Sequence, residues 1–184
     1  METKFSVFIA TSLDGYIARK DGGIDWLDKA NALVPAGEDC GYQAFFDTID
    51  VLVMGRNAFE KILSFPAWPY GEKPVIVLSR NPLPIPGDLA ATVSHSNQPP
   101  EELASTLAEQ GVKRVYLDGG TTIQRFMAAG LVDDLTITLI PVLLGEGIPL
   151  FGPLTEDIPL RQVGSKTYDW GFVQLKYTLV PKSR

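Results

Sequence analysis

One stretch constrains the fold more than any other, the run Val115-Tyr116-Leu117-Asp118-Gly119-Gly120-Thr121-Thr122. It begins with residues typical of a strand, continues through two glycines, and opens a helical pattern that reaches Ala129. Glycine lets the backbone approach a ligand where a Cβ would clash, and free N–H groups in a first helical turn attract anions. The stretch therefore predicts a strand, a tight turn and a helix that together form an anion-binding cradle. An ordinary strand–helix turn is the alternative.

Two other predicted strands end in a similar way. Val51–Met54 is a continuous apolar run, typical of a strand covered on both faces, and Gly55-Arg56-Asn57 follows it at a helix start. Pro74–Leu78 is followed by Ser79-Arg80. Ligands of open α/β sheets bind beyond the carboxyl ends of the strands. We therefore expect three such ends to surround one extended, phosphorylated ligand.

The remaining regular elements complete an α/β pattern. They are a strand at Phe5–Ala10, a helix from Pro99 and Pro100 to Gly111, a strand at Asp133–Ile140, and a hairpin of Leu160–Tyr168 and Phe172–Val180. Strands joined by helical crossovers, followed by an antiparallel hairpin, predict a mixed central sheet flanked by helices. We expect one domain over residues 1–184.

The other segments are less regular. Residues 19–37 are predicted as a long irregular loop that acts as a lid, with Trp26 or Leu27 reaching inward. Asp39 to Thr48 is predicted as a short helix with Phe45 and Phe46 on its buried side. A weak strand is predicted at Ala90–Val93.

Composition excludes several classes of function. The net charge is −6 and no basic face stands out, which argues against a nucleic-acid partner. No apolar run reaches membrane-spanning length and the N-terminus lacks the pattern of a signal peptide, so we expect a cytoplasmic protein. The single cysteine, Cys40, excludes an internal disulfide, and with one histidine it leaves no metal site to predict. That histidine, His95, is predicted to lie idle and exposed in a loop.

The motifs, taken in order, resemble the dihydrofolate reductase superfamily. Within it they resemble most the reductase domain of riboflavin biosynthesis, the C-terminal half of the bifunctional deaminase-reductase, and its stand-alone relatives. The resemblance runs from about Lys4 to Val180. The residues that carry it are Ser12-Leu13-Asp14-Gly15-Tyr16-Ile17-Ala18, Val53-Met54-Gly55-Arg56, Val77-Leu78-Ser79-Arg80, Leu117-Asp118-Gly119-Gly120, and the run from Pro141 to Phe151.

This resemblance implies a three-layer dihydrofolate-reductase-like fold, a homodimer and NADPH-dependent reduction. The implied activity is similar to that of 5-amino-6-(5-phosphoribosylamino)uracil reductase. The positions that match the family's cofactor site are Ala10, Ile17, Gly55, Arg56, Asn57, Leu78, Ser79, Arg80, Gly119, Gly120, Thr121, Thr122 and Ile123. The pyrophosphate would lie on the helix start after Gly120, and the adenosine 2′-phosphate against Arg56, Ser79 and Arg80.

Three carboxylates are candidates for the acceptor side. Asp14 matches an aspartate of the riboflavin-reductase motif, with a plain turn residue as the alternative. Asp118 stands where that domain usually has glutamate. Asp39 lies 16 residues ahead of Gly55, like the helix carboxylate that grips the pteridine in dihydrofolate reductases, with a helix-capping acid as the alternative.

Two other functions remain open at this stage. One is a reductase of dihydrofolate, other pterins or small carbonyl and imine compounds. The other is a nucleotide-binding protein without turnover. The deaminase half of the bifunctional enzyme is absent, because its zinc site needs more cysteines than this chain has.

Overall fold

The computed structural model describes residues 3–180. The strands are β1 (Lys4–Ser12), β2 (Tyr16–Ala18), β3 (Val51–Gly55), β4 (Val75–Leu78), β5 (Val93–Ser96), β6 (Arg114–Asp118), β7 (Asp134–Ile140), β8 (Ile148–Pro149), β9 (Leu160–Thr167) and β10 (Val173–Leu179). The helices are α1 (Asp25–Asn31), α2 (Tyr42–Phe46), α3 (Arg56–Leu63), α4 (Pro100–Glu109) and α5 (Gly120–Ala128).

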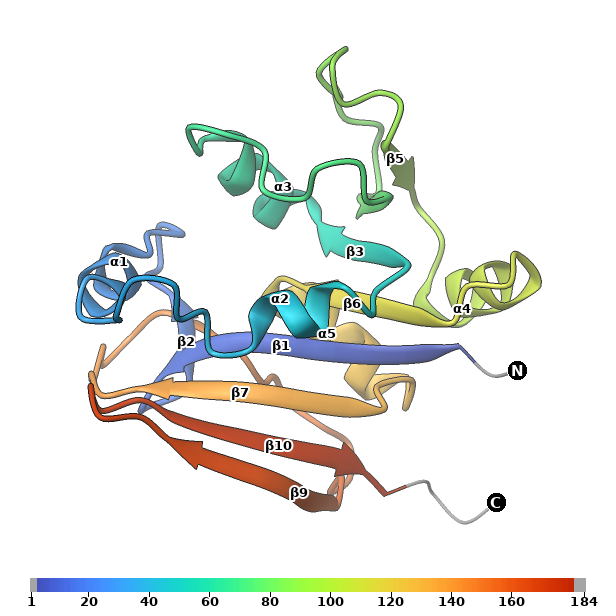
Figure 1. The fold of residues 1–184 in the computed structure, drawn as a ribbon. Helices are drawn as coiled ribbons and strands as arrows, with labels where there is room; N and C mark the ends of the chain where they lie inside the picture. The colour runs from blue at the N-terminus through green and yellow to red at the C-terminus, as the bar shows by residue number, and fades with distance from the viewer. Residues whose placement is uncertain (1–2, 181–184) are drawn as a thin grey trace.

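One large sheet organises the molecule (Figure 1). Within residues 3–180 it has eight strands in the order β5-β4-β3-β6-β1-β7-β10-β9. The six strands from β5 to β7 are parallel, β10 pairs antiparallel with β7, and β9 pairs antiparallel with β10. The predicted mixed sheet and its C-terminal hairpin are therefore confirmed.

The parallel strands are apolar on both faces, so that their side chains pack into two separate core layers. Successive side chains of a strand point to opposite faces. In β3, Val51 and Val53 pack with α4 and α5, whereas Leu52 and Met54 pack on the opposite face with α3. The continuous apolar run at Val51–Met54 is thus a strand covered on both sides, as its composition predicted.

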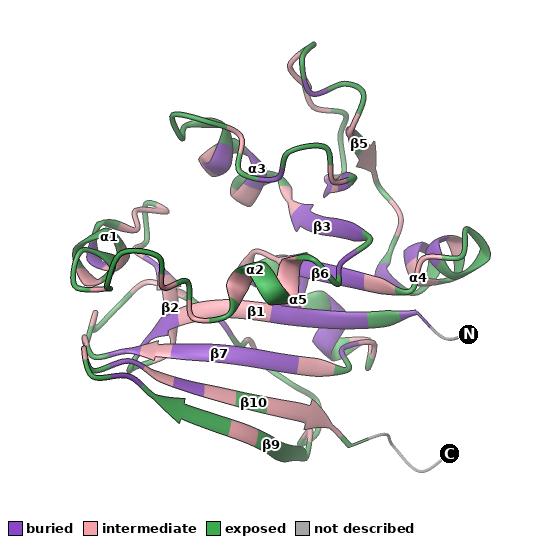
Figure 2. Cartoon of the chain, viewed as in Figure 1, coloured by how far each residue is buried: buried purple, intermediate pink, exposed green. Residues whose placement is uncertain are grey.

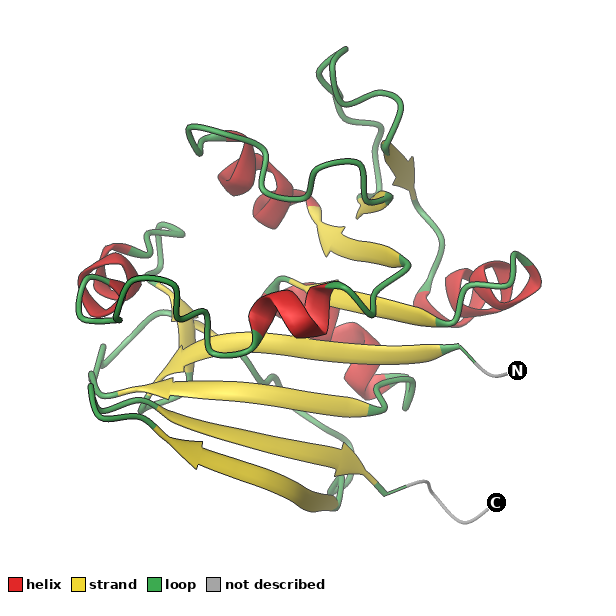
Figure 3. Ribbon diagram, in the orientation of Figure 1, coloured by secondary structure: helices red, strands yellow, loops and turns green. Residues whose placement is uncertain are grey.

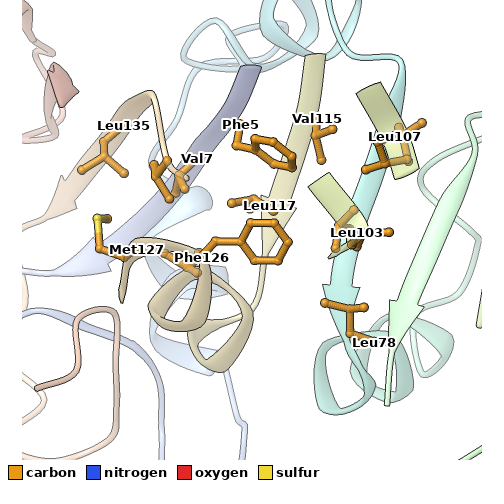
Figure 4. Packing of buried hydrophobic residues seen from close by; sticks show 14 of the residues in the cluster. Phe5, Val7, Leu78, Leu103, Leu107, Val115, Leu117, Phe126, Met127 and Leu135 are labelled. Atoms are coloured by element: carbon orange, nitrogen blue, oxygen red, sulfur yellow. The ribbon is translucent and has the colours of Figure 1, made fainter. Parts of the chain in front are cut away.

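Helices cover both faces, as the ribbon coloured by secondary structure shows (Figure 3). In the layer under α4 and α5, Phe126 of α5 lies against Phe5 and Leu117 of the strands, and Met127 lies toward Val7 and Leu135 (Figure 4). The ring centroids of Phe5 and Phe126 are 5.3 Å apart. Since Phe126 is fully buried, its replacement by alanine would destabilise the fold by roughly 3–5 kcal/mol. This packing holds α5 against β1 and β6.

Several local predictions were wrong in detail. Residues 19–37 contain a helix, α1, held by buried Trp26, so this segment is more ordered than an irregular loop. The helix predicted over Asp39 to Thr48 is confined to α2, because Asp39 and the residues after it form a turn. The predicted strand at Ala90–Val93 begins only at Val93. As a result, His95 lies in β5, half-buried, and its Nε2 is 2.9 Å from the Ser79 carbonyl oxygen.

A small second sheet was not predicted. The short strand β2 pairs antiparallel with β8, although about 130 residues separate them in sequence. It brings the segment after β1 next to the Gly147–Pro149 segment. Gly147 permits this contact, since a Cβ there would meet the Ala18 carbonyl oxygen at a forbidden distance.

Candidate functional site

The carboxyl ends of the parallel strands meet at one edge of the sheet, because the strands run in the same direction. The register aligns Met54 with Asp118 and Gly55 with Leu78. The ends of β3, β4 and β6, which the sequence singled out separately, are therefore neighbours.

At the centre of this edge, the backbone of the Gly119–Gly120 turn is closely packed. Gly119 has φ +87°, a conformation that side chains rarely adopt, and a Cβ there would lie 3.2 Å from the Ala58 Cβ. A Cβ on Gly120 would lie 3.1 Å from both the Ile17 Cδ1 and the Pro149 carbonyl oxygen. Both positions favour glycine, because there is too little space around the turn for a side chain.

Two helices start at this edge without a capping side chain. The N-cap residues are Gly55 for α3 and Gly119 for α5, and neither has a side chain that satisfies the first N–H groups. A Cβ on Gly55 would lie 3.1 Å from the Thr122 Oγ1, so the two helix starts are close together. Uncapped N–H groups with the positive end of a helix dipole suit an anion such as a pyrophosphate.

Cations and hydroxyls lie around these helix starts. Arg56 opens α3 and is half-exposed, with its Nε 2.6 Å from the Glu60 carboxylate. Arg80 is exposed just after β4, and the Ser79 hydroxyl donates to the Asn81 carbonyl oxygen at 2.7 Å. Arginines at this edge suit a phosphate, because the guanidinium is permanently charged and binds in a fork.

The remaining predicted cofactor residues divide into two groups. Ile17, Asn57 and Thr121 keep part of their surface accessible at the edge. Leu78 and Ile123 are buried in the core beneath it, and the Ile123 N–H is already bonded to the Gly119 carbonyl oxygen. Thr122 is buried, and Ala10 is half-buried on β1 opposite Thr138. Ala10 therefore belongs with the partly accessible group, and Thr122 belongs with the buried one.

Asp118 ends β6 and is half-buried at the centre of the edge. Its Oδ1 accepts a hydrogen bond from the Gly119 N–H at 2.8 Å. Burial raises the pKa of Asp118 above its ordinary value, while the Gly119 N–H and the Tyr70 hydroxyl act in the opposite direction.

Asp14 lies in the turn between β1 and β2 and joins it to a distant loop. Its carboxylate accepts hydrogen bonds from the Ser12 hydroxyl at 2.6 Å, the Gly145 N–H at 2.8 Å and the Leu144 N–H at 3.1 Å. The bond from Ser12 is the main reason that the pKa of Asp14 is lowered. The structure thus gives Asp14 a role in holding the turn and the loop together.

Asp39 is exposed in the turn before α2. Its two oxygens accept hydrogen bonds from the Gly41 N–H at 2.8 Å and the Gln43 N–H at 2.7 Å. These bonds lower the pKa of Asp39, and the bond from Gln43 has the larger effect. A carboxylate that caps a helix in this way matches the capping alternative.

Sequence reasoning missed the tyrosines near Asp118. Tyr42 of α2 and Tyr70 of the loop after α3 both have their pKa raised, by burial first and by the charge of Asp118 second. No local signal could have found them, since each comes from a different element. Only the fold places them at the end of β6.

The described residues were compared with the requirements of a metal site and of a membrane-spanning helix. Among residues 3–180, no group of three or more histidine, cysteine or acidic side chains is arranged to hold a metal ion. No helix in that part of the chain is both long and apolar enough to cross a membrane.

Comparison with known proteins identifies relatives along nearly the whole chain. The model of the RibD C-terminal domain matches residues 3–174. The uncharacterized protein YwjB of Bacillus subtilis (strain 168) is 37% identical over 181 residues, which cover 96% of this chain and 98% of that protein.

Solved structures agree with this assignment. A protein from Shewanella sp. PV-4, provisionally named a riboflavin biosynthesis protein, superposes with a TM-score of 0.90 at 39% identity, covering 96% of this chain and 99% of the other. Dihydrofolate reductase from Enterococcus faecalis, solved in complex with NADP(H), superposes with a TM-score of 0.62 at 19% identity and 96% coverage of both chains. The second likeness shows that the fold is dihydrofolate-reductase-like.

Proposed function

The chain belongs to the family of RibD C-terminal domains, and we propose that it is a reductase that uses NADPH to reduce a small heterocyclic, imine or carbonyl compound. The activity would be similar to that of 5-amino-6-(5-phosphoribosylamino)uracil reductase. The observation that carries the proposal is the pair of uncapped helix starts at Gly55 and Gly119, side by side at one edge of the sheet.

The residues present fit such a cofactor. The first N–H groups of α5 would bind the pyrophosphate, and the positive φ of Gly119 and its close approach to Ala58 favour glycine at the turn that presents them. Arg56, Ser79 and Arg80 would bind the adenosine 2′-phosphate. Ala10 and Ile17 would lie against the nicotinamide ring, which supplies the hydride when the cofactor is bound.

The chain's own contribution is to place the acceptor and limit access of water. The small sheet of β2 and β8 packs on the Gly119–Gly120 turn through Ile17 and Pro149. Asp118, at the same strand end, would orient the acceptor. Asp39 is less suited to this role because its oxygens already accept two backbone N–H groups.

The experiment is a cofactor-binding and turnover assay. Purified protein is titrated with NADPH and NADH, and NADPH consumption is then followed with 5-amino-6-(5-phosphoribosylamino)uracil and with dihydrofolate. We expect micromolar NADPH binding, weaker NADH binding and turnover of the uracil compound. Turnover of dihydrofolate alone would assign a pterin reductase. Binding of NADPH without turnover of either compound would contradict the reductase and support a nucleotide-binding protein.

We also propose that the protein is a homodimer that associates through the C-terminal hairpin. The outer strand β9 is exposed along most of its length, with apolar Leu160 and Val163 among its side chains. The register shift between Lys176 and Tyr177 leaves Val163 as the extra residue of a β-bulge. Since a bulge interrupts strand-to-strand pairing, side-chain packing would make this interface.

A further inference from the structure

His95 lies on β5 and contacts the end of the neighbouring strand β4. Within residues 3–180, β5 is the outermost strand on its side of the large sheet, and His95 is aligned with Val77 of β4. The Nε2 atom of His95 lies 2.9 Å from the Ser79 carbonyl oxygen. Because a carbonyl oxygen can only accept a hydrogen bond, Nε2 carries the hydrogen in this contact. The one histidine of the chain is therefore a donor to the residue that precedes Arg80.

The polar groups of Ser79 already have partners within the protein. Its N–H donates to the Ser96 carbonyl oxygen at 3.1 Å, and its hydroxyl donates to the Asn81 carbonyl oxygen at 2.7 Å. A hydroxyl has one proton, so the Ser79 side chain must leave Asn81 before it can donate to a phosphate. Arg80 differs, because it is exposed and, within residues 3–180, no backbone carbonyl accepts its N–H. The Arg80 N–H is therefore available to a ligand.

The bond from His95 also sets the direction of the Arg80 N–H. Residues 3–180 contain no cis peptide bond, so the peptide between Ser79 and Arg80 is planar and trans. In such a peptide the carbonyl group and the following N–H point in opposite directions. The N–H and the carbonyl of Ser79 both face β5, and the Arg80 N–H therefore points away from β5. The strand on that side of β4 is β3.

The end of β3 supplies further donors on that side. Gly55, the last residue of β3, is aligned with Leu78 of β4, and Arg56 follows it at the start of α3. A guanidinium has five N–H donors, and in Arg56 the carboxylate of Glu60 takes the one on Nε at 2.6 Å. The Arg80 N–H thus points to the side of the sheet where Arg56 keeps donors free. A backbone N–H together with two guanidinium groups suits a phosphate, which accepts several hydrogen bonds at once.

We infer that His95 is a positioning residue for the choice of cofactor, which directs the Arg80 N–H toward the 2′-phosphate of NADPH by holding the Ser79 carbonyl. The inference rests on the proposed function, since it deepens the cofactor site named there. It adds to that site one backbone donor and one side chain that acts through another residue. NADH has no phosphate at this position, so NADH binding should not depend on His95.

The first test uses NMR on the wild type. Since the chain has one histidine, its imidazole signals belong to His95, and the Nε2 hydrogen should be protected from exchange with water. Adenosine 2′,5′-bisphosphate and adenosine 5′-monophosphate are then titrated separately. The Arg80 amide proton should move downfield with the bisphosphate only, while the Gly130 amide beyond the far end of α5 stays unchanged. An unprotected imidazole hydrogen, or an Arg80 amide that responds equally to both nucleotides or to neither, would overturn the inference.

The second test measures the same two nucleotides by calorimetry in three variants. His95→Leu removes the donor, His95→Gln keeps an N–H donor at similar reach, and Ser94→Ala is the matched control on the exposed part of β5. The wild type should prefer the bisphosphate by about tenfold or more, because charge-assisted hydrogen bonds are lost with the monophosphate. This preference should shrink by about two- to tenfold in His95→Leu, the range that one hydrogen bond contributes, and persist in the other two variants. An equal preference in the wild type and His95→Leu, or an equal loss in Ser94→Ala, would overturn the role of His95.

The Arg80→Ala background separates the backbone donor from the guanidinium, because alanine keeps the N–H. His95→Leu should reduce the preference for the bisphosphate by the same factor with and without the Arg80 side chain. A reduction that disappears in Arg80→Ala would mean that His95 places the guanidinium, and would contradict the step through the N–H. If His95→Leu does not fold, the wild-type titration decides the question by itself.

Turnover separates this inference from the proposed function. His95→Leu should raise the KM for NADPH and leave kcat and the KM for NADH unchanged, since the 2′-phosphate lies away from the reacting ring. An unchanged KM for NADPH in an active enzyme contradicts the role of His95 and leaves the reductase intact. The absence of NADPH consumption by the wild type, with the Arg80 shift and the nucleotide preference both present, contradicts the reductase and leaves the role of His95 intact.

Discussion

The centre of the sheet and its C-terminal hairpin are built on different principles. Strands β3 and β6 are buried along most of their length, whereas β9 is almost entirely exposed (Figure 2). At the centre, backbone atoms and small side chains approach closely at Gly119, while on the hairpin the apolar side chains of Leu160 and Val163 face outward. One sheet thus separates the proposed ligand edge from the proposed dimer surface. Substitutions in one region should leave the other's function unchanged.

The largest effect is expected from Gly119→Ala. The positive φ and the 3.2 Å approach to Ala58 both oppose a Cβ, so we expect a loss of stability of about 1–3 kcal/mol. The turn would also shift, so NADPH affinity should fall by at least about tenfold, a change of roughly 1.4 kcal/mol. Chemical denaturation and calorimetry measure the two effects.

Gly130→Ala is the matched control for this substitution. Gly130 follows the opposite end of α5 with φ +69°, and a Cβ there would meet nothing within 4 Å. The Gly130→Ala variant should lose stability through backbone strain and keep its NADPH affinity. If both variants lose NADPH affinity equally, backbone strain explains the loss, and the close packing at Gly119 has no specific role in binding NADPH.

The next effect concerns the choice of cofactor. Arg56→Ala and Arg80→Ala each remove a cation at the ends of β3 and β4. A charge-assisted hydrogen bond contributes roughly 1.5–3 kcal/mol, so NADPH should weaken by about ten- to a hundredfold while NADH hardly changes. Arg161→Ala, on exposed β9, is the control from the hairpin region and should leave both affinities unchanged. If NADPH and NADH weaken equally, the phosphate does not lie at these arginines.

A smaller effect tests the hairpin. Val163→Lys places a charge on a side chain that is 55% exposed at the bulge of β9. We expect it to weaken the proposed dimer, as seen by analytical ultracentrifugation, and to leave NADPH binding unchanged. A monomeric wild type at micromolar concentration would disprove the assembly, and a dimer unaffected by the lysine would place its interface elsewhere.

The smallest effect is expected at Asp14, which is exposed. Because its pKa is lowered in the folded protein, its contribution to stability is present above the unfolded pKa and is lost as pH falls through the folded one. Asp14→Asn should increase hydrogen exchange at the Leu144 and Gly145 amides near neutral pH, where the wild type is ionised. The amides of α5 should exchange unchanged. Faster exchange throughout the sheet would mean that Asp14 supports more than the turn and the loop.

Much of the fold was predictable because its signals are local. Apolar runs such as Val51–Met54 and the glycine pair after Asp118 mark buried strands and tight turns by their own composition. The pairing of β2 with β8 was not predictable, since both strands are too short to show a period. His95 was misplaced because its strand is polar and belongs to the edge of the sheet.

The candidate site was predictable to a smaller extent. Motifs located the ends of β3, β4 and β6, and the structure makes them neighbours. Asp118 was found because it adjoins the glycines, but Tyr70, whose pKa is raised by burial and then by the charge of Asp118, lies in a loop whose residues show no pattern. Contacts between side chains from separate elements depend on how those elements pack, and a local sequence pattern does not contain this information.

The central position of β1 also governs the order in which the chain can fold as it is synthesised. Among the strands of residues 3–180, β1 is made first, yet its partners β6 and β7 lie about 110 and 128 residues later. At a synthesis rate of roughly 5–20 residues per second, β1 waits many seconds for its second neighbour. During that time its apolar residues, including Phe5 and Val7, are without their native cover. Nascent chains that stop before Asp134 should therefore bind chaperones that recognise exposed apolar strands, and those that extend beyond β7 should release them.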